Sequence, residues 1–211
     1  MTVLYDYWRS SAAYRVRIAL NLKGVSYEQE SVNLVSGAQS EAGYRDRINP
    51  QGLVPALVIG GVALTQSLAI IDYLEETIPE PPLLPEQPAE RARVRAMAQV
   101  IACDIHPLNN LRVLKYLKGP LGQGQEAVDA WYRHWIQEGF TALERQTGAG
   151  PYLSGDRPGL ADICLVPQMY NARRFNVDLD PFSRLVSIDE ACRALSAFDK
   201  AAPENQPDAQ R

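Results

Sequence analysis

The sequence has few of the residues that metal sites and disulfide frameworks require. It contains 3 cysteines and 2 histidines among 211 residues. Cys103, Cys164 and Cys192 are odd in number and widely separated, and they form neither a C-x-x-C pair nor a zinc-binding pattern. We therefore expect reduced thiols, no metal site and a cytoplasmic protein. Because no cysteine stands at an obvious catalytic position, any thiol chemistry has to use a thiol supplied by another molecule.

The chain also lacks an excess of positive charge and any long apolar run. Its 21 Lys and Arg are outnumbered by 25 Asp and Glu, which gives a formal net charge of −4. Nucleic-acid binding favours a basic face, so this class of partner is not expected. No apolar stretch has transmembrane length, and the amino end has no signal-peptide pattern. We expect neither nucleic acid nor membrane as a partner.

The first eighty residues alternate strand-like and helix-like patterns, with Gly60-Gly61 as a hairpin signal between two strands and Ser67 as the expected N-cap of the last helix. The expected strands cover 3–7, 27–32 and two stretches within 53–64, and the expected helices cover 11–23, 41–47 and 68–76. This order predicts a small α/β domain with parallel pairing in its first half and antiparallel pairing in its second.

The second half has no strand signals. A proline-rich stretch ends the first domain, since proline cannot continue a helix. Helical patterns follow over 90–116, 125–146, 160–175 and 188–200, and Pro107 and Pro167 are expected to kink them. We predict an α/β domain over 1–80, a linker over 81–89 and an all-helical domain over 90–211.

Two serines, Ser10 and Ser11, stand where the first strand meets the first helix. A helix N-terminus has N–H groups without intrahelical partners and carries partial positive charge. It therefore stabilises an anion, and a thiolate is one such anion. Serine is also an ordinary N-cap, so this pair alone does not distinguish a cap from a thiolate site.

Several motifs add to this pair in a specific order and spacing. They are 9–11 (RSS) with 15–20 (RVRIAL), 49–57 (NPQGLVPAL), 66–71 (QSLAII), 104–111 (DIHPLNNL), 155–156 with 160–162 (LAD), 172–179 (ARRFNVDL), and 203 with 206–208 (QPD). Over essentially its whole length the chain resembles the zeta class of the glutathione S-transferases, the class that contains maleylacetoacetate isomerase. The resemblance implies the glutathione S-transferase fold, with a thioredoxin-like amino domain, a helical domain that contributes to the substrate site, a homodimer and glutathione as cofactor.

The resemblance also implies roles for individual residues that bind glutathione. Ser10, with Ser11 beside it, matches the serine that holds the thiolate, and the backbone of Val54 before a cis Pro55 matches the partner of the cysteinyl part. Gln66 and Ser67 match the pair that holds the γ-glutamyl end. A hydroxyl and N–H groups at a helix start suit that carboxylate.

His106 and Asn110 are spaced to share one face of the kinked helix. By resemblance that face borders the active cleft, which makes both residues candidates for glutathione binding. The alternative is a core histidine and an asparagine that bonds backbone.

Two positions depart from the family. Ala12 stands where many zeta enzymes carry a cysteine, so the nucleophile has to be glutathione's own sulfur, and Gly159 replaces the usual Ser or Thr N-cap before Asp162.

A maleyl substrate has a cis double bond conjugated to carbonyls and two carboxylates. A thiolate can isomerise it by reversible conjugate addition, and glutathione is then not consumed. The substrate's carboxylates need cations, for which Arg9, Arg174 and Arg112 are the candidates. For any one of them the alternative is a solvated ion pair.

Four functions stay open from the sequence. The preferred one is glutathione-dependent isomerisation of maleylacetoacetate to fumarylacetoacetate in aromatic amino-acid (tyrosine) degradation, and the others are its alternatives. Maleylpyruvate isomerisation uses the same chemistry, and a general glutathione transferase or haloacid dehalogenase would use the same thiolate. A non-catalytic thioredoxin-like interaction protein is the alternative from another class.

Overall fold

The computed structural model describes residues 1–210, which form two compact units. Unit 1 comprises Met1–Pro82 and the chain from Ala194 onward, and unit 2 comprises Leu83–Arg193. This division differs from the predicted domains at the carboxyl end, because the last helix packs on the first helix of unit 1. Among the described residues, no helix has the length and apolar character needed to cross a membrane.

Unit 1 is built around a four-stranded mixed sheet of order β2-β1-β3-β4. Its elements are β1 (Val3–Asp6), α1 (Ser11–Leu22), β2 (Glu28–Ser31), the short 3-10 turn Ala38–Ser40, α2 (Ala42–Arg45), β3 (Ala56–Ile59), β4 (Val62–Thr65), α3 (Ser67–Thr77), α10 (Ser196–Ala201) and the 3-10 turn Pro203–Asn205. β1 pairs in parallel with β2 and antiparallel with β3, and β3 pairs antiparallel with β4. The predicted parallel first half and antiparallel second half are thus confirmed.

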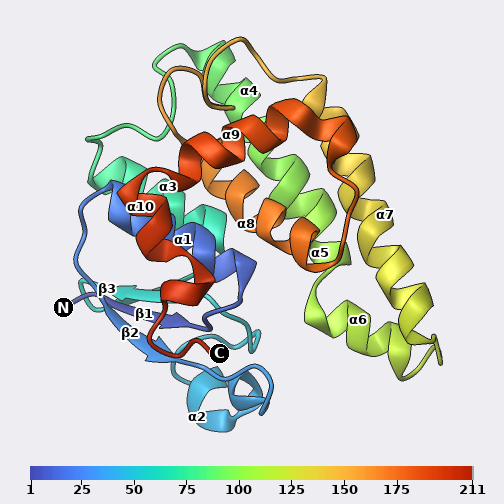
Figure 1. The fold of residues 1–211 in the computed structure, drawn as a ribbon. Helices are drawn as coiled ribbons and strands as arrows, with labels where there is room; N and C mark the ends of the chain where they lie inside the picture. The colour runs from blue at the N-terminus through green and yellow to red at the C-terminus, as the bar shows by residue number, and fades with distance from the viewer. Residues whose placement is uncertain (211) are drawn as a thin grey trace. The chain divides into compact units, whose positions relative to one another are not determined.

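Helix α1 is the centre of unit 1. It packs against α3 on one side and α10 on another, so none of the residues from Ser11 to Leu20 is exposed to solvent (Figure 1). That burial includes Arg15 and Arg17, two charged residues in an otherwise apolar run. Buried arginine is rare unless it is paired, so partners for both are expected.

Unit 2 is all-helical, as the sequence predicts. Its elements are α4 (Pro88–Gln99), a π-helix (Val100–Ile105), α5 (His106–Leu108), α6 (Leu111–Lys118), α7 (Gln125–Glu144), α8 (Leu160–Arg174), the 3-10 turn Asp180–Phe182 and α9 (Ser183–Arg193). α8 packs against α4 and α9 and is buried along nearly its whole length. Pro167 lies inside α8 without ending it.

Three helix predictions were wrong in detail. The expected helix 90–116 widens into a π-helix ahead of Pro107 and ends near Asn109, because proline cannot supply the N–H of a regular turn. The expected helix 188–200 is two helices, α9 and α10, interrupted at 194–195. Ser67 is the first residue of α3 and not its N-cap, which is Gln66 with φ of 69°.

The start of α8 explains why Gly159 departs from the usual Ser or Thr. The Asp162 carboxylate accepts hydrogen bonds from the N–H groups of Leu153 (2.7 Å), Ser154 (3.1 Å) and Gly159 (3.0 Å). A Cβ on Gly159 would lie 2.4 Å from the Leu83 carbonyl oxygen and 2.9 Å from the Ser154 hydroxyl. Glycine therefore fits where a better capping side chain would clash.

We predict that Gly159→Ser lowers the free energy of unfolding by about 1–3 kcal/mol, because the clash outweighs the gained cap. Gly124, the N-cap of α7, is the matched control, since a Cβ there would meet no described atom within 4 Å. Thermal unfolding should show a lower Tm for Gly159→Ser and an unchanged or slightly higher Tm for Gly124→Ser. An equal Tm for both variants would contradict this account of Gly159.

Candidate active site

Ser10 lies at the amino end of α1 as its N-cap. Its hydroxyl oxygen accepts from the Ala13 N–H (3.3 Å), and its own N–H donates to the Tyr7 carbonyl (2.8 Å). Ser11 is the first, buried residue of the helix. A half-buried hydroxyl at the positive end of a 12-residue helix is a favourable place for an anion.

Arg9 precedes this cap and is half-buried. Its guanidinium lies over the Trp8 ring, 5.0 Å from the centroid, a distance typical of a cation–π contact. This contact restricts the positions that the Arg9 guanidinium can take. Arg9 is followed directly in the sequence by Ser10.

The Val54–Pro55 peptide is cis, as the resemblance implies. The preceding loop is fixed by the Leu53 carbonyl, which accepts from the Tyr44 hydroxyl (2.7 Å) and the Asn49 amide (2.8 Å). Burial raises the pKa of Tyr44, so its hydroxyl stays a donor. The backbone of Val54 is thereby held at the entry to β3.

Gln66 and Ser67 begin α3. Gln66 has a left-handed backbone (φ 69°), a conformation uncommon for a residue other than glycine and often found at functional sites. The buried Ser67 hydroxyl accepts from the Arg15 guanidinium of α1 (3.3 Å). Sequence analysis did not single out Arg15, although a charged residue in the apolar run of α1 was a usable signal.

The sheet register brings these three groups to one end of unit 1. Ala56 lies opposite both Tyr5 of β1 and Thr65 of β4. The end of β1, the start of β3 and the end of β4 therefore lie at the same end of the sheet. The serine pair, the cis-proline loop and the start of α3 all continue directly from those strand ends.

In unit 2 the predicted pairing of His106 and Asn110 on one helical face does not form. α5 spans only His106–Leu108 with Asn109 as its C-cap, and Asn110 has an extended backbone (ψ 143°). Its side-chain oxygen accepts from the Arg112 N–H (3.1 Å) and caps α6. The alternative of an asparagine bonded to backbone therefore describes Asn110.

A cavity of about 420 Å³ lies among α6, α7 and the end of α8. Its charged lining residues are Lys115, Lys118, Asp129, Arg133 and Arg174. Four cations against one carboxylate make this cavity suited to an anion. Two arginines of unit 2 were predicted to bind the substrate's carboxylates. Arg174 lines this cavity, and Arg112 does not.

Arg174 is placed in this cavity by aromatic packing. Its guanidinium lies 4.9 Å from the centroid of the Phe175 ring, which stacks on Tyr132 at 3.6 Å. Burial raises the pKa of Tyr132 to about 12, and the charge of Arg174 opposes that rise in part.

Two of the chain's own cysteines, Cys164 and Cys192, are poorly suited to be the nucleophile because they are buried. All three are free thiols, with Cys164 and Cys192 buried and Cys103 exposed. Burial, together with the nearby carboxylates Asp162 and Asp189, raises the pKa of Cys192. Within residues 1–210, no three His, Cys, Asp or Glu side chains gather where they could hold a metal ion.

Comparison with known proteins fits this geometry. A family model for the glutathione S-transferase N-terminal domain matches residues 4–82. A probable maleylacetoacetate isomerase of Vibrio cholerae is 54% identical over 98% of both chains. The holo structure of a maleylpyruvate isomerase, a bacterial zeta-class glutathione S-transferase, is 48% identical with a TM-score of 0.96, covering 99% of this chain and 100% of that one. The chain belongs to the zeta class of the glutathione S-transferases.

A third relative shows what such a site can hold. The maleylacetoacetate isomerase of Anaeromyxobacter dehalogenans is 44% identical with a TM-score of 0.88, covering 100% of this chain and 98% of that chain. Its active site contains dicarboxyethyl glutathione and citrate. The glutathione S-transferase fold predicted from the sequence is confirmed for this chain.

Proposed function

We propose that this chain is a glutathione-dependent isomerase that converts maleylacetoacetate to fumarylacetoacetate. The observation that carries the proposal is the gathering of the serine pair, the cis-proline loop and the start of α3 at one end of the sheet. The probable maleylacetoacetate isomerase and the maleylpyruvate isomerase compared above are 54% and 48% identical to this chain, over 98% and 100% of their own lengths.

The residues at this end of the sheet fit glutathione chemically. Ser10 at the amino end of α1 offers a hydroxyl and a positive helix end, which suit a thiolate. Ser67, with the buried Arg15 guanidinium at 3.3 Å, suits the γ-glutamyl carboxylate. The Val54 backbone offers the N–H and carbonyl that pair with a cysteinyl unit. We propose these residues, with Ser11, Pro55 and Gln66, as the glutathione site.

Glutathione, when bound, supplies a thiol whose anion adds reversibly to the substrate's cis double bond, so that the bond can rotate before the thiol is released unchanged. Ser10 holds that sulfur in its anionic form, which matters because a free thiol has a pKa of about 8.5. Arg9, whose guanidinium lies over the Trp8 ring, is the cation that we propose to stabilise the negative charge developing on the substrate. Dicarboxyethyl glutathione in a relative's active site carries the linkage that such an addition forms.

The substrate's two carboxylates require further cations. Arg174 is our preferred residue, because it lines a cavity in which four cations face one carboxylate. Arg112, the other substrate-binding candidate of unit 2, lies outside the cavity lining. His106 and Asn110 stay proposed glutathione-binding residues, and the Asn110 side chain is engaged as the cap of α6. The contribution of the helical domain to the substrate site stays a prediction.

We further propose a cytoplasmic homodimer that acts in aromatic amino-acid degradation. Three free cysteines support a reducing compartment. Homodimerisation rests on the family resemblance, and sedimentation or light scattering of the purified chain measures it.

Maleylpyruvate is the second candidate substrate, favoured by the 48% identity to a maleylpyruvate isomerase. Both substrates should be offered to the purified chain with zero and with catalytic glutathione, and product should be followed by absorbance. We expect turnover that requires glutathione without consuming it, faster with maleylacetoacetate. Faster turnover of maleylpyruvate would assign that substrate instead.

Two other results would contradict the isomerase proposal. Consumption of glutathione with a haloacid or aryl halide, without turnover of either maleyl substrate, would indicate a transferase or dehalogenase. Failure to bind glutathione would indicate a non-catalytic interaction protein.

Ser10→Ala should raise the pKa of the bound glutathione thiol toward about 8.5 and slow turnover at neutral pH by about tenfold or more. Loss of the cap to the Ala13 N–H should also cost about 1 kcal/mol of stability. Ser10→Thr keeps the hydroxyl and is the control. The ultraviolet absorbance of the thiolate, titrated against pH, measures the shift, and an unchanged pKa in Ser10→Ala would refute the role of Ser10.

Arg174→Ala should raise KM for the dianionic substrate by about 10–100-fold, the loss of one charge-assisted hydrogen bond. Arg112→Ala removes the same charge outside the cavity lining and should change KM by less than about threefold. Steady-state kinetics at saturating glutathione distinguishes them. Equal effects of the two variants would count against the cavity as the place of the carboxylate.

A further inference from the structure

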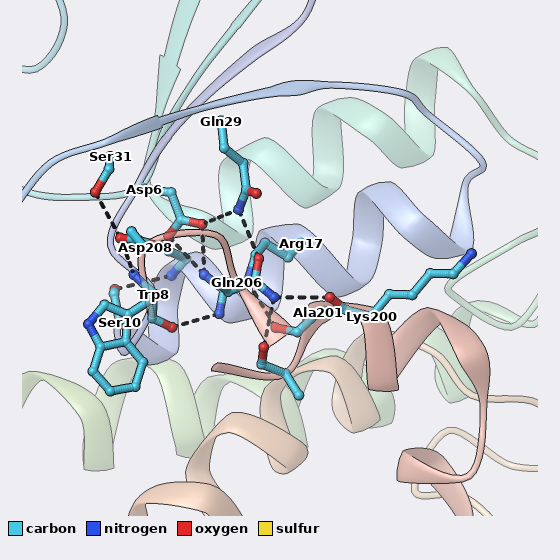
Figure 2. A network of polar contacts seen from close by, with 12 residues as sticks. Asp6, Trp8, Ser10, Arg17, Gln29, Ser31, Lys200, Ala201, Gln206 and Asp208 are labelled. Atoms are coloured by element: carbon cyan, nitrogen blue, oxygen red, sulfur yellow. Dashed lines mark hydrogen bonds and ion pairs between the residues drawn. The ribbon is translucent and has the colours of Figure 1, made fainter. Parts of the chain in front are cut away.

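The last residues of the chain fold back onto the loop that carries Ser10. The Asp208 carboxylate oxygen Oδ2 accepts from the Trp8 N–H (3.2 Å) and from the Ser31 hydroxyl (2.8 Å). These bonds join residues 200 and 177 positions apart in the sequence (Figure 2). They connect the motif 206–208 to the loop between β1 and α1.

Gln206 fixes the turn that presents Asp208. Its side chain is buried, and its amide nitrogen donates to the carbonyls of Ala202 (2.7 Å) and Lys200 (2.9 Å). Its amide oxygen accepts from Gln29 of β2 (2.9 Å). Both ends of this amide are thus bonded, so the segment after α10 is held to the sheet as well as to its own helix.

The carbonyl group of Trp8 is held by Arg17. The Arg17 guanidinium donates to the Trp8 carbonyl (2.9 Å), to both oxygens of Asp6 (2.7 and 2.9 Å) and to the Ala201 carbonyl (2.9 Å). The Trp8 residue is therefore bonded at its N–H by the carboxyl-terminal segment and at its carbonyl by α1 (Figure 2).

This arrangement acts on the proposed site, because Trp8 is followed directly by Arg9 and Ser10. The Trp8 ring also makes the cation–π contact with the Arg9 guanidinium. We propose that Asp208 is a positioning residue, which fixes the Trp8–Ser10 loop so that the Ser10 hydroxyl and the Arg9 cation meet the glutathione sulfur and the substrate. The inference rests on the proposed function.

If Asp208 served only to stabilise the fold, its removal would unfold the chain without a specific effect on the Ser10 loop. Asp208 is half-exposed, so its carboxylate keeps part of its contact with water. Its carboxylate oxygen Oδ2 accepts hydrogen bonds from the backbone N–H of Trp8 and from the hydroxyl of Ser31 in β2. Its removal is therefore expected to displace the loop more than to unfold the chain.

The test compares the pH titration of thiolate absorbance for glutathione bound to the unmodified chain, Asp208→Ala and Asp208→Asn. Asp208→Ala removes the acceptor, so the loop and its serine move away from the sulfur. We expect the pKa of the bound thiol to rise by about one unit and kcat at neutral pH to fall about tenfold. Asp208→Asn keeps an acceptor oxygen in the same place and should restore values close to those of the unmodified chain.

The asparagine variant also separates position from charge. If Asp208 acted only through its negative charge, both variants would lower the pKa of the thiol, since a nearby anion disfavours a thiolate. That result would overturn the inference, as would a pKa and kcat for Asp208→Ala equal to those of the unmodified chain. Glu204→Ala, which removes an exposed carboxylate from the same segment, is the control and should leave both values unchanged.

Should Asp208→Ala fail to fold, Asp208→Glu replaces it. The glutamate keeps the charge but moves the carboxylate by one methylene, so the pKa of the thiol should again rise, and an unchanged pKa would overturn the inference. If the unmodified chain binds no glutathione, the proposed function itself fails. If it isomerises normally while the Asp208 variants match it, only the positioning role fails.

Discussion

The buried guanidinium of Arg17 is the interaction on which the organisation of unit 1 depends. Its side chain is 0% exposed, and it joins the end of β1 through Asp6, the loop through the Trp8 carbonyl and α10 through the Ala201 carbonyl. Removing one partner of a buried ion pair costs about 3–5 kcal/mol, because the remaining charge is left uncompensated. The loop before Ser10 thus has one defined place, and the helix end that favours a thiolate is presented in a fixed direction.

Much of the fold follows from the sequence because its signals are local. The hairpin at Gly60-Gly61 and the alternation around it predict β3 and β4 closely. Predictions failed where a backbone detail decided the outcome. Ser67 looked like an N-cap, but a left-handed Gln66 takes that position, and His106 and Asn110 are separated by the end of α5. Neither a left-handed glutamine nor a π-helix has a reliable signature in a single sequence.

The candidate site shows the same division. Ser10, Val54 and Pro55 could be named in advance, because they lie in motifs that recur at fixed spacing. The support of the site could not, since Arg17 meets Ala201 and Trp8 meets Asp208 across about the whole length of the chain. Arginines two positions apart in an apolar helix indicate that buried partners exist, but they do not indicate which residues those are.

The bonds from Asp208 and Arg17 to Trp8 should hold the loop before Ser10 in one position in the free chain. Amide hydrogen exchange of the Trp8 backbone N–H, measured by NMR on the free chain, reports on this loop, because that N–H donates only to the Asp208 carboxylate among the described contacts. We predict that this amide exchanges as slowly as amides within α1, such as that of Tyr14. Exchange at the rate of an exposed loop amide would show instead that the Ser10 loop is open in solution and that Asp208 does not hold it.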